Sequence, residues 1–225
     1  MRDAIERIRR DGYSTVLKEL ATRIPHISTN ITPIFVSQPD IPVVIPNAVV
    51  TNAHDWESLS AGVKTITVNG CDDYQKELLD LSRFSELEEL KIGAKCFNYV
   101  SHVRIVGLKR LRSIEIGENG LQNESSDSEL VIQNCPSLVS LSISRNSFKG
   151  FGTMKLSELN ALKTIGIRYH CFRKADLVVK DMRSLESISI GDGCFEDSRH
   201  TVIESGVVFI CSSHRLSQAG ENECW

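Results

Sequence analysis

A short pattern of apolar and polar positions recurs along the chain. In each copy the first, fourth and sixth residues are apolar with polar residues between them, as in Leu-Glu-Ser-Ile-Ser-Ile at residues 185–190. We call this pattern the frame. Its copies are 23 to 27 residues apart and begin at Val63, Leu87, Leu111, Leu138, Leu162 and Leu185. Recurrence at this period is typical of repeat proteins, in which each repeat contacts only its neighbours.

The alternation of apolar and polar residues predicts two short strands in each repeat, each with one buried face. One strand carries the fourth and sixth frame positions. The other carries an apolar pair upstream of the frame: Leu79 and Leu81, Val103 and Ile105, Leu130 and Ile132, Met154 and Leu156, Leu177 and Val179. A single turn cannot bury its apolar face, so neighbouring turns are expected to stack about 4.8 Å apart. We therefore predict a mainly β repeat solenoid over residues 61–211, with about six coils of two short parallel strands each.

Further recurring positions predict the corners of the coils. An apolar residue follows the frame in five repeats and predicts a nearly continuous aromatic column: Phe97, Leu121, Phe148, Phe172 and Phe195, with Tyr74 displaced by one position in the first repeat. A glycine at 93, 117 and 191 suits a tight corner or a positive φ. The longer third repeat places its extra residues in the polar segment 123–128, which we interpret as a loop outside the core.

The N-terminal flank is predicted to precede and cap the array. Residues 1–23 fit an amphipathic helix that either docks on the first open repeat or binds a partner or a membrane surface. Residues 24–60 fit a Pro-rich linker and cap, because five of the six prolines lie in 24–50 and exclude continuous helix there. Within this segment we expect an irregular or edge strand in 41–50, and a short helix or turn that places Trp56 over the first coil.

The C-terminal flank shows no seventh frame. Thr201 and Ile203 fit one more upstream strand, and we interpret 197–211 as a partial closing repeat. Residues 212–225 are mostly polar and predict a disordered tail.

Composition limits the classes of function. A net charge of −3 argues against a nucleic-acid binder held by phosphate contacts. No apolar run reaches the roughly 18 residues of a membrane span, and the charged first ten residues do not fit a secretory signal. The seven cysteines include no C-x-x-C pair, which favours a reducing compartment over a disulfide framework. We therefore expect a cytoplasmic protein.

Cysteine and histidine positions were compared with the patterns of catalytic and metal sites. Cys96, Cys171 and Cys194 share one repeat position, which Asp72, Gly120 and Ser147 occupy in the other copies. We interpret it as a corner position for a small residue; a redox or metal role is the alternative, since Cys171 and Cys194 are expected on adjacent turns within disulfide reach. His170 beside Cys171 lacks a third partner for nucleophilic catalysis. We predict a non-enzymatic protein without a cofactor, metal site or catalytic residue.

Outward-facing frame positions form the candidate binding face. Stacked repeats would place small and mixed polar side chains in a flat strip. Its predicted members are Glu89, Lys91, Glu115, Ser140, Ser142, Thr164, Ser187 and Ser189. The alternative is an ordinary solvated sheet surface. The upstream strands offer a mildly basic strip with Arg104, Lys155 and Lys180, and neither strip carries an aromatic anchor of the kind that dominates binding energy.

The frame resembles leucine-rich-repeat proteins, in which Leu-x-x-Leu-x-Leu is followed by Asn or Cys. Here Leu-x-x-Ile-x-Ile-Gly is followed by Cys-Phe or Ser-Phe over roughly residues 61–205, without the Asn ladder. It is similar to short variant repeats of expanded families in single-celled eukaryotes, and to BspA-like proteins in style. The resemblance implies a scaffold for protein interactions, without shared catalytic residues, and the missing Asn ladder implies a straighter two-sheet coil.

Three functional hypotheses follow. The first is a non-enzymatic scaffold that binds an unidentified protein partner through the stacked face. The second is a carbohydrate-binding or carbohydrate-active β-helix, which would need clustered carboxylates beside an aromatic platform; Glu89 and Glu115 are its two candidate carboxylates. The third is a truncated member of an expanded repeat family without a separate role. The sequence identifies neither the partner nor the oligomeric state.

Overall fold

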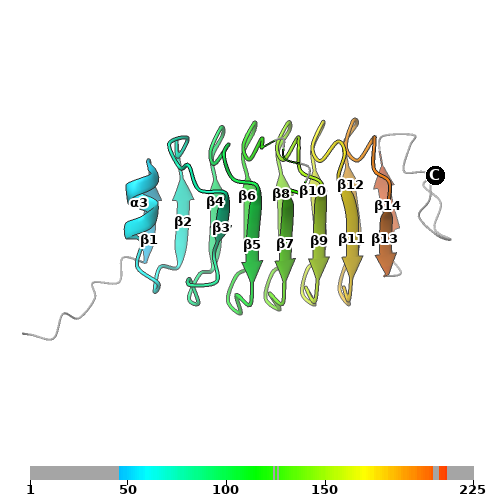
Figure 1. Ribbon diagram of the computed structural model, residues 1–225. Coiled ribbons are helices and arrows are strands. Elements are labelled where there is room, and N and C mark those ends of the chain that lie inside the picture. Colours follow the sequence, from blue (N-terminus) through cyan, green and yellow to red (C-terminus); the bar gives the residue numbers. More distant parts are fainter. Residues whose placement is uncertain (1–45, 124, 126, 205–207, 212–225) are drawn as a thin grey trace, which may run out of the picture. The chain divides into compact units, whose positions relative to one another are not determined.

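The computed structural model describes residues 46–123, 125, 127–204 and 208–211. Within this region two sheets of parallel strands stack into a solenoid, and the strands stand side by side along it (Figure 1). The prediction of a mainly β solenoid with two parallel strands in each of about six coils is confirmed.

Sheet A has eight strands in spatial order: β1 (Asn47–Val50), β2 (Thr65–Val68), β4 (Glu89–Ile92), β6 (Ser113–Ile116), β8 (Ser140–Ile143), β10 (Thr164–Ile167), β12 (Ser187–Ile190) and β14 (Val208–Cys211). Sheet B has six: β3 (Leu78–Asp80), β5 (His102–Val106), β7 (Glu129–Gln133), β9 (Thr153–Ser157), β11 (Asp176–Lys180) and β13 (Thr201–Glu204). Frame strands form sheet A and upstream strands form sheet B, so the chain crosses between sheets twice in each coil.

The register stacks equivalent frame positions on one another. Ile66 pairs with Leu90, Leu90 with Ile114, and Ile114 with Leu141 along sheet A. The upstream pairs predicted from sequence are buried in the same way on the inner face of sheet B. The residual gap between the two apolar faces has a volume of ≈ 10 Å³. The two apolar faces therefore leave barely the space of one water molecule between them.

Aromatic rings form two separate groups rather than a nearly continuous column. Phe172 stacks on Phe148 at 4.7 Å and on Phe195 at 5.5 Å between ring centroids. At the other end Trp56 makes edge contacts with Tyr74, Phe84 and Phe97 at 6.4, 5.7 and 5.2 Å. Leu121 occupies the equivalent position in the intervening repeat, so the aliphatic side chain divides the two groups.

Positive φ angles fall on residues other than the predicted glycines. Phe97, Phe148, Phe172 and Phe195 have φ between 50° and 58°, in the left-handed region. Gly93, Gly117 and Gly191 are absent from the positive-φ residues of the described chain. A Cβ atom on Gly117 would instead lie 2.5 Å from the carbonyl carbon of Gly93. Close approach of neighbouring coils, and not positive φ, is what requires glycine there.

The prediction that no seventh frame follows residue 195 is wrong. Strand β14 pairs in parallel with β12, with Val208 opposite Ser187 and Phe209 opposite Ile188. The pattern is hard to recognise because Gly206 stands at the first frame position and the offset from Ser187 to Val208 is only 21 residues. The upstream strand expected at Thr201 and Ile203 is present as β13.

At the N-terminal end, β1 is the edge strand of sheet A and pairs with β2. Helix α3 (Ala53–Ser58) follows, and Trp56 on it is buried against the first coils. The Asn52 side chain accepts from Asp55 N at 2.9 Å, and the Asp55 carboxylate accepts from Thr51 N at 2.9 Å, which caps the helix. The predicted helix in 1–23, the linker up to residue 45 and the tail 212–225 lie outside the described residues.

Candidate functional site

The predicted binding residues all lie on the outer face of sheet A, where they alternate with buried positions. The register arranges this face as two rows that run across the strands. Row one is Thr65, Glu89, Ser113, Ser140, Thr164 and Ser187. Row two is Thr67, Lys91, Glu115, Ser142, Gly166 and Ser189. Neighbours in a row are separated by the spacing of adjacent strands, about 4.8 Å.

The outer face has a charged part over β4 and β6. Lys91 Nζ lies 3.7 Å from Glu115 Oε2 on the neighbouring strand. Glu89 lies in the other row, opposite Ser113. The register therefore separates the two candidate carboxylates into different rows and pairs one of them with a lysine.

The remainder of the outer face, over β8, β10 and β12, carries only short side chains. Ser142, Thr164 and Ser189 are exposed, whereas Ser140 and Ser187 are half-buried. Gly166 completes row two and has no side chain. Each hydroxyl can both donate and accept a hydrogen bond. This part of the sheet is consequently flat, uncharged and rich in adaptable hydrogen-bonding groups.

The basic strip expected on sheet B is not continuous. Arg104 and Lys155 share a row with Val131, Val178 and Val202, whereas Lys180 lies in a different row. Lys155 Nζ is 3.1 Å from Glu129 Oε2, and Lys180 Nζ is 2.8 Å from Glu204 Oε1. Acidic residues of neighbouring coils therefore pair with two of the three cations of the strip. The sequence pattern of a single strand does not show these pairs.

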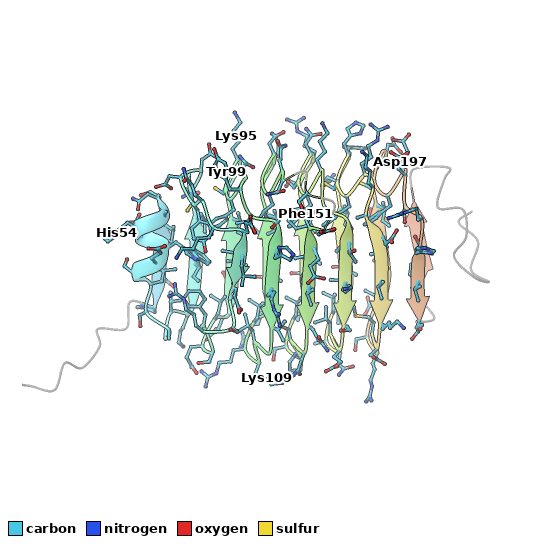
Figure 2. The ribbon with its side chains drawn as sticks, in the orientation of Figure 1. His54, Lys95, Tyr99, Lys109, Phe151 and Asp197 are labelled. Atoms are coloured by element: carbon cyan, nitrogen blue, oxygen red, sulfur yellow. The ribbon has the colours of Figure 1, made fainter. Side chains whose placement is uncertain are left out.

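Sequence reasoning missed two exposed aromatic residues. Tyr99 and Tyr169 are 55% and 48% exposed, and both lie in the corners that follow strands of sheet A. Figure 2 shows Tyr99 on the same edge of the solenoid as Lys95 and Asp197, with Lys109 on the opposite edge. The sequence signal for these two residues is a tyrosine at a repeat position that is not predicted to be buried.

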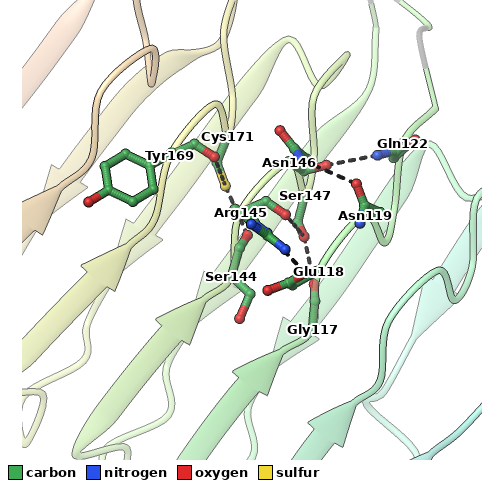
Figure 3. A network of polar contacts seen from close by, with 10 residues as sticks. All are labelled: Gly117, Glu118, Asn119, Gln122, Ser144, Arg145, Asn146, Ser147, Tyr169 and Cys171. Carbon is green, nitrogen blue, oxygen red and sulfur yellow. Dashed lines mark hydrogen bonds and ion pairs between the residues drawn. The ribbon is translucent and has the colours of Figure 1, made fainter.

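The shared cysteine position forms a ladder of hydrogen bonds between coils (Figure 3). Ser147 Oγ donates to Gly117 O at 2.6 Å, Cys171 Sγ to Ser144 O at 3.1 Å, and Cys194 Sγ to Arg168 O at 2.8 Å. Each acceptor directly follows a strand of the preceding coil. In these three copies a small side chain with one proton to donate links the corner to the preceding coil.

In the first coil this position belongs to Cys71 and not to Asp72. Phe97 N donates to Cys71 O just as Leu121 N donates to Cys96 O, so Cys71 is the equivalent residue. Cys71 comes three residues after the end of β2, whereas Cys96 comes four residues after the end of β4, which displaced the alignment made from sequence. Cys71, Cys96, Cys171 and Cys194 are all buried and free of disulfide bonds.

A polar network holds the corner beside the longer loop (Figure 3). Arg145 Nε lies 3.0 Å from Glu118 Oε2, and Asn146 Nδ2 donates to Asn119 Oδ1 at 3.3 Å. Gln122 Nε2 donates to Asn146 O at 2.9 Å. Because every contact links successive coils, the network holds the corners after β6 and β8 together.

A hollow of ≈ 330 Å³ lies between β1 and α3. Its lining combines apolar Val49, which is 64% exposed, with the polar side chains of Asn47, Asp55 and Ser58. It adjoins β1, the edge strand of sheet A among the described strands, so a segment seated there would meet both an apolar side chain and the edge of a sheet.

No group of three or more His, Cys, Asp or Glu residues among those that the structure describes is placed to hold a metal ion. No described helix is long and apolar enough to cross a membrane. No protein-family model matches the chain, and no solved structure is significantly similar to it. The class defined by the fold is the parallel β-solenoid.

Proposed function

We propose that this protein is a non-enzymatic repeat scaffold that binds a protein partner through the outer face of sheet A. The observation that carries the proposal is the register, which joins outward frame positions of successive strands into one continuous face. A rigid sheet presents its polar groups in advance, so binding loses little conformational entropy.

The two parts of the face would have different roles. Short side chains over β8, β10 and β12 would allow a flat partner surface to approach closely and exchange hydrogen bonds with Ser142 and Ser189. The ion pair of Lys91 and Glu115 over β4 and β6 would set the orientation of that partner, because charges contribute more to specificity than to affinity.

We also propose a protein family and a cellular compartment for this chain. The frame supports membership in the variant leucine-rich-repeat proteins, and the two-sheet coil fits the straighter form expected without the Asn ladder. Buried cysteines that are free of disulfides support a cytoplasmic location, where thiols stay reduced.

Matched threonine substitutions on the two sheets test the proposal. Thr164→Arg places a long cation in the middle of the outer face of sheet A, and Thr153→Arg places the same side chain on sheet B. Neither residue is buried, so both variants should keep their stability within about 0.5 kcal/mol. Proximity labelling in the native cell should show that Thr164→Arg, and independently Ser142→Arg, lose partners that Thr153→Arg retains. Identical labelling of all three variants would reject this face as the binding site.

A further inference from the structure

The four buried cysteines of the corner position form two pairs on adjacent coils. Cys171 and Cys194 follow β10 and β12, which are paired neighbours in sheet A. Cys171 N donates to Cys194 Sγ at 3.3 Å, so the sulfur of one cysteine lies directly against the backbone of the other. Cys71 and Cys96 stack in the same way at the N-terminal end, but Cys96 Sγ donates within its own turn, to Ala94 O at 3.4 Å.

Backbone hydrogen bonds hold the two C-terminal corners together on both sides of this thiol pair. His170 N donates to Asp192 O at 2.9 Å, and Phe195 N donates to Phe172 O at 3.1 Å. These bonds keep the corners near the strand spacing of about 4.8 Å, which lies within the roughly 4.4–6.8 Å between Cα atoms that a disulfide spans.

We propose that Cys171 and Cys194 form a redox-active dithiol, which hydrogen peroxide converts to a disulfide that ties the corner after β12 to the corner after β10. The proposal is independent of the function proposed for sheet A. In the reduced protein both thiols donate structural hydrogen bonds. The proposal makes the same two residues a site of covalent modification.

The reaction has two balanced steps. The Cys194 thiolate attacks one oxygen of hydrogen peroxide, the O–O bond breaks, and the departing hydroxide takes up a proton to become water, which leaves a sulfenic acid on Cys194. The Cys171 thiolate then attacks the Cys194 sulfur and expels the second oxygen as hydroxide, which takes up the proton released by Cys171 and leaves as water. Two thiols are oxidised and one peroxide is reduced to two waters.

The electrostatic environment distinguishes the two sulfurs. The pKa of Cys194 is lowered because the Cys171 thiol and then the Cys171 backbone N–H hydrogen-bond to its sulfur, against the effect of burial. The pKa of Cys171 is raised by the same hydrogen bond and by burial. Burial raises the pKa of Cys71 to about 12, so this thiol of the N-terminal pair is a poor nucleophile. The pair after β10 and β12 is expected to react first, because Cys194 Sγ lies against the backbone of Cys171, whereas Cys96 Sγ donates within its own turn.

Ser147 supplies a matched substitution for the test. It occupies the same corner position in the preceding coil, where its hydroxyl donates to Gly117 O at 2.6 Å. Cys171→Ser should therefore retain the fold and its donor while removing one thiol. Cys135 lies alone at the opposite corner and donates to Gln133 O at 3.4 Å, so Cys135→Ser is the control that leaves the pair intact.

The experiment treats the reduced full-length chain with graded hydrogen peroxide, blocks remaining thiols with N-ethylmaleimide and maps linked peptides by mass spectrometry. We expect a Cys171–Cys194 link in the wild-type chain and in Cys135→Ser. In Cys171→Ser, which lacks the second thiol, Cys194 should proceed to sulfinic acid. Amide exchange in β12 of the oxidised wild-type chain should slow by at least about tenfold, because a cross-link restricts opening of the loop that it closes.

Three outcomes would overturn the proposal. One is that Cys171 and Cys194 remain alkylatable at every peroxide concentration that leaves the chain folded. Another is that the principal link joins other cysteines, such as Cys71 and Cys96. The third is an unchanged amide exchange rate in β12 of the linked chain, which would show that the disulfide does not hold the two corners together.

Discussion

At the residue scale, a buried phenylalanine in the left-handed region is the most unusual choice in this chain. Phe172 has a φ of 50° and stacks between Phe148 and Phe195. A left-handed backbone costs about 1–2 kcal/mol for a residue with a Cβ atom. Burial of a phenylalanine side chain contributes about 1.5–3 kcal/mol, and each aromatic pair adds about 0.5–1.5 kcal/mol. The ring contacts therefore outweigh the backbone strain, and the corner keeps a large apolar side chain where glycine would relax the backbone.

Two substitutions of Phe172 separate packing from backbone strain. Phe172→Ala removes the ring contacts with Phe148, Phe151 and Phe195 but keeps the strained φ, and should lower the free energy of unfolding by about 3–5 kcal/mol. Phe172→Leu should cost only about 1–2 kcal/mol, because Leu121 already occupies the equivalent position at a φ of 54°. Urea denaturation monitored by circular dichroism measures both values. Equal losses for the two variants would contradict this account of the aromatic group.

The identity of the buried residues could be predicted from sequence, but their backbone angles could not. The repeat identified Phe172 as inward-facing because an apolar residue follows the frame at this position in five of the six copies. The glycines at 93, 117 and 191 were predicted to suit a tight corner or positive φ, and the structure assigns the positive φ to other residues. The conformation of a corner depends on hydrogen bonds with the coil on either side, which lie about two dozen residues away in sequence.

At the element scale, strands of three to five residues hold together only by stacking. Isolated pairs of this length are marginal in water, and each inner strand gains its stability from a parallel partner on both sides. Close approach of the coils follows directly from this arrangement. At Gly117 the backbone of the preceding coil occupies the space that a Cβ atom would need, with the carbonyl carbon of Gly93 at 2.5 Å and the nitrogen of Ala94 at 2.7 Å.

Paired glycine substitutions test this close approach. Gly117→Ala should destabilise the chain by about 1–3 kcal/mol, because only backbone atoms could move to relieve the contact. Gly166→Ala is the matched control in sheet A, where the added Cβ would be 4.0 Å from Leu141 O. It should be neutral or raise stability by about 0.4–1 kcal/mol, since alanine restricts the unfolded chain. Thermal unfolding of both variants would settle the comparison; an unaffected Gly117→Ala would refute the steric argument.

Ion pairs also join stacked coils, but they do not determine the register. Most of them join residues of successive coils, as Lys64 does with Glu88 at 3.2 Å and Lys163 with Glu186 at 3.6 Å. Exposed pairs of this kind contribute about 0–1 kcal/mol each. The register therefore rests on the buried rows, and the charges reinforce it.

At the scale of the whole molecule, the solenoid is a linear array closed at one end by α3. Trp56 contacts the rings of Tyr74, Phe84 and Phe97, and its carbonyl accepts from Arg83 Nη2 at 2.7 Å. The N-terminal coils thereby gain an apolar neighbour in place of water. In an array with contacts only between neighbours, the effect of losing this cap should decay with distance along the solenoid.

Removal of the cap gives a directional prediction. Trp56→Ala should cost about 3–5 kcal/mol locally and raise amide exchange in β2 and β4 by at least about a hundredfold. Exchange in β10 and β12 should change by less than about tenfold, because several coils separate them from the cap. Phe172→Ala should show the reverse order. Hydrogen exchange read by mass spectrometry makes the comparison, and a uniform increase over all coils would show that the array opens as one unit.

The repeat period and the burial pattern determined much of this molecule from sequence alone. They identified the inward positions of the six frames, the two strands in each coil and the outward rows that make up the candidate face. Identical apolar positions can be buried only by stacking on one another, so the coil and its register follow from hydrophobic burial.

Contacts between distant coils decided the rest. Only the tertiary structure revealed the seventh frame strand β14 and the equivalence of Cys71 with Cys96. It also revealed that Cys171 N hydrogen-bonds to Cys194 Sγ. Each of these depends on distances between residues in neighbouring coils, where a corner longer or shorter by one residue changes which atoms meet. The sequence pattern determines the order of the coils, whereas the contacts between their corners form only when the coils stack.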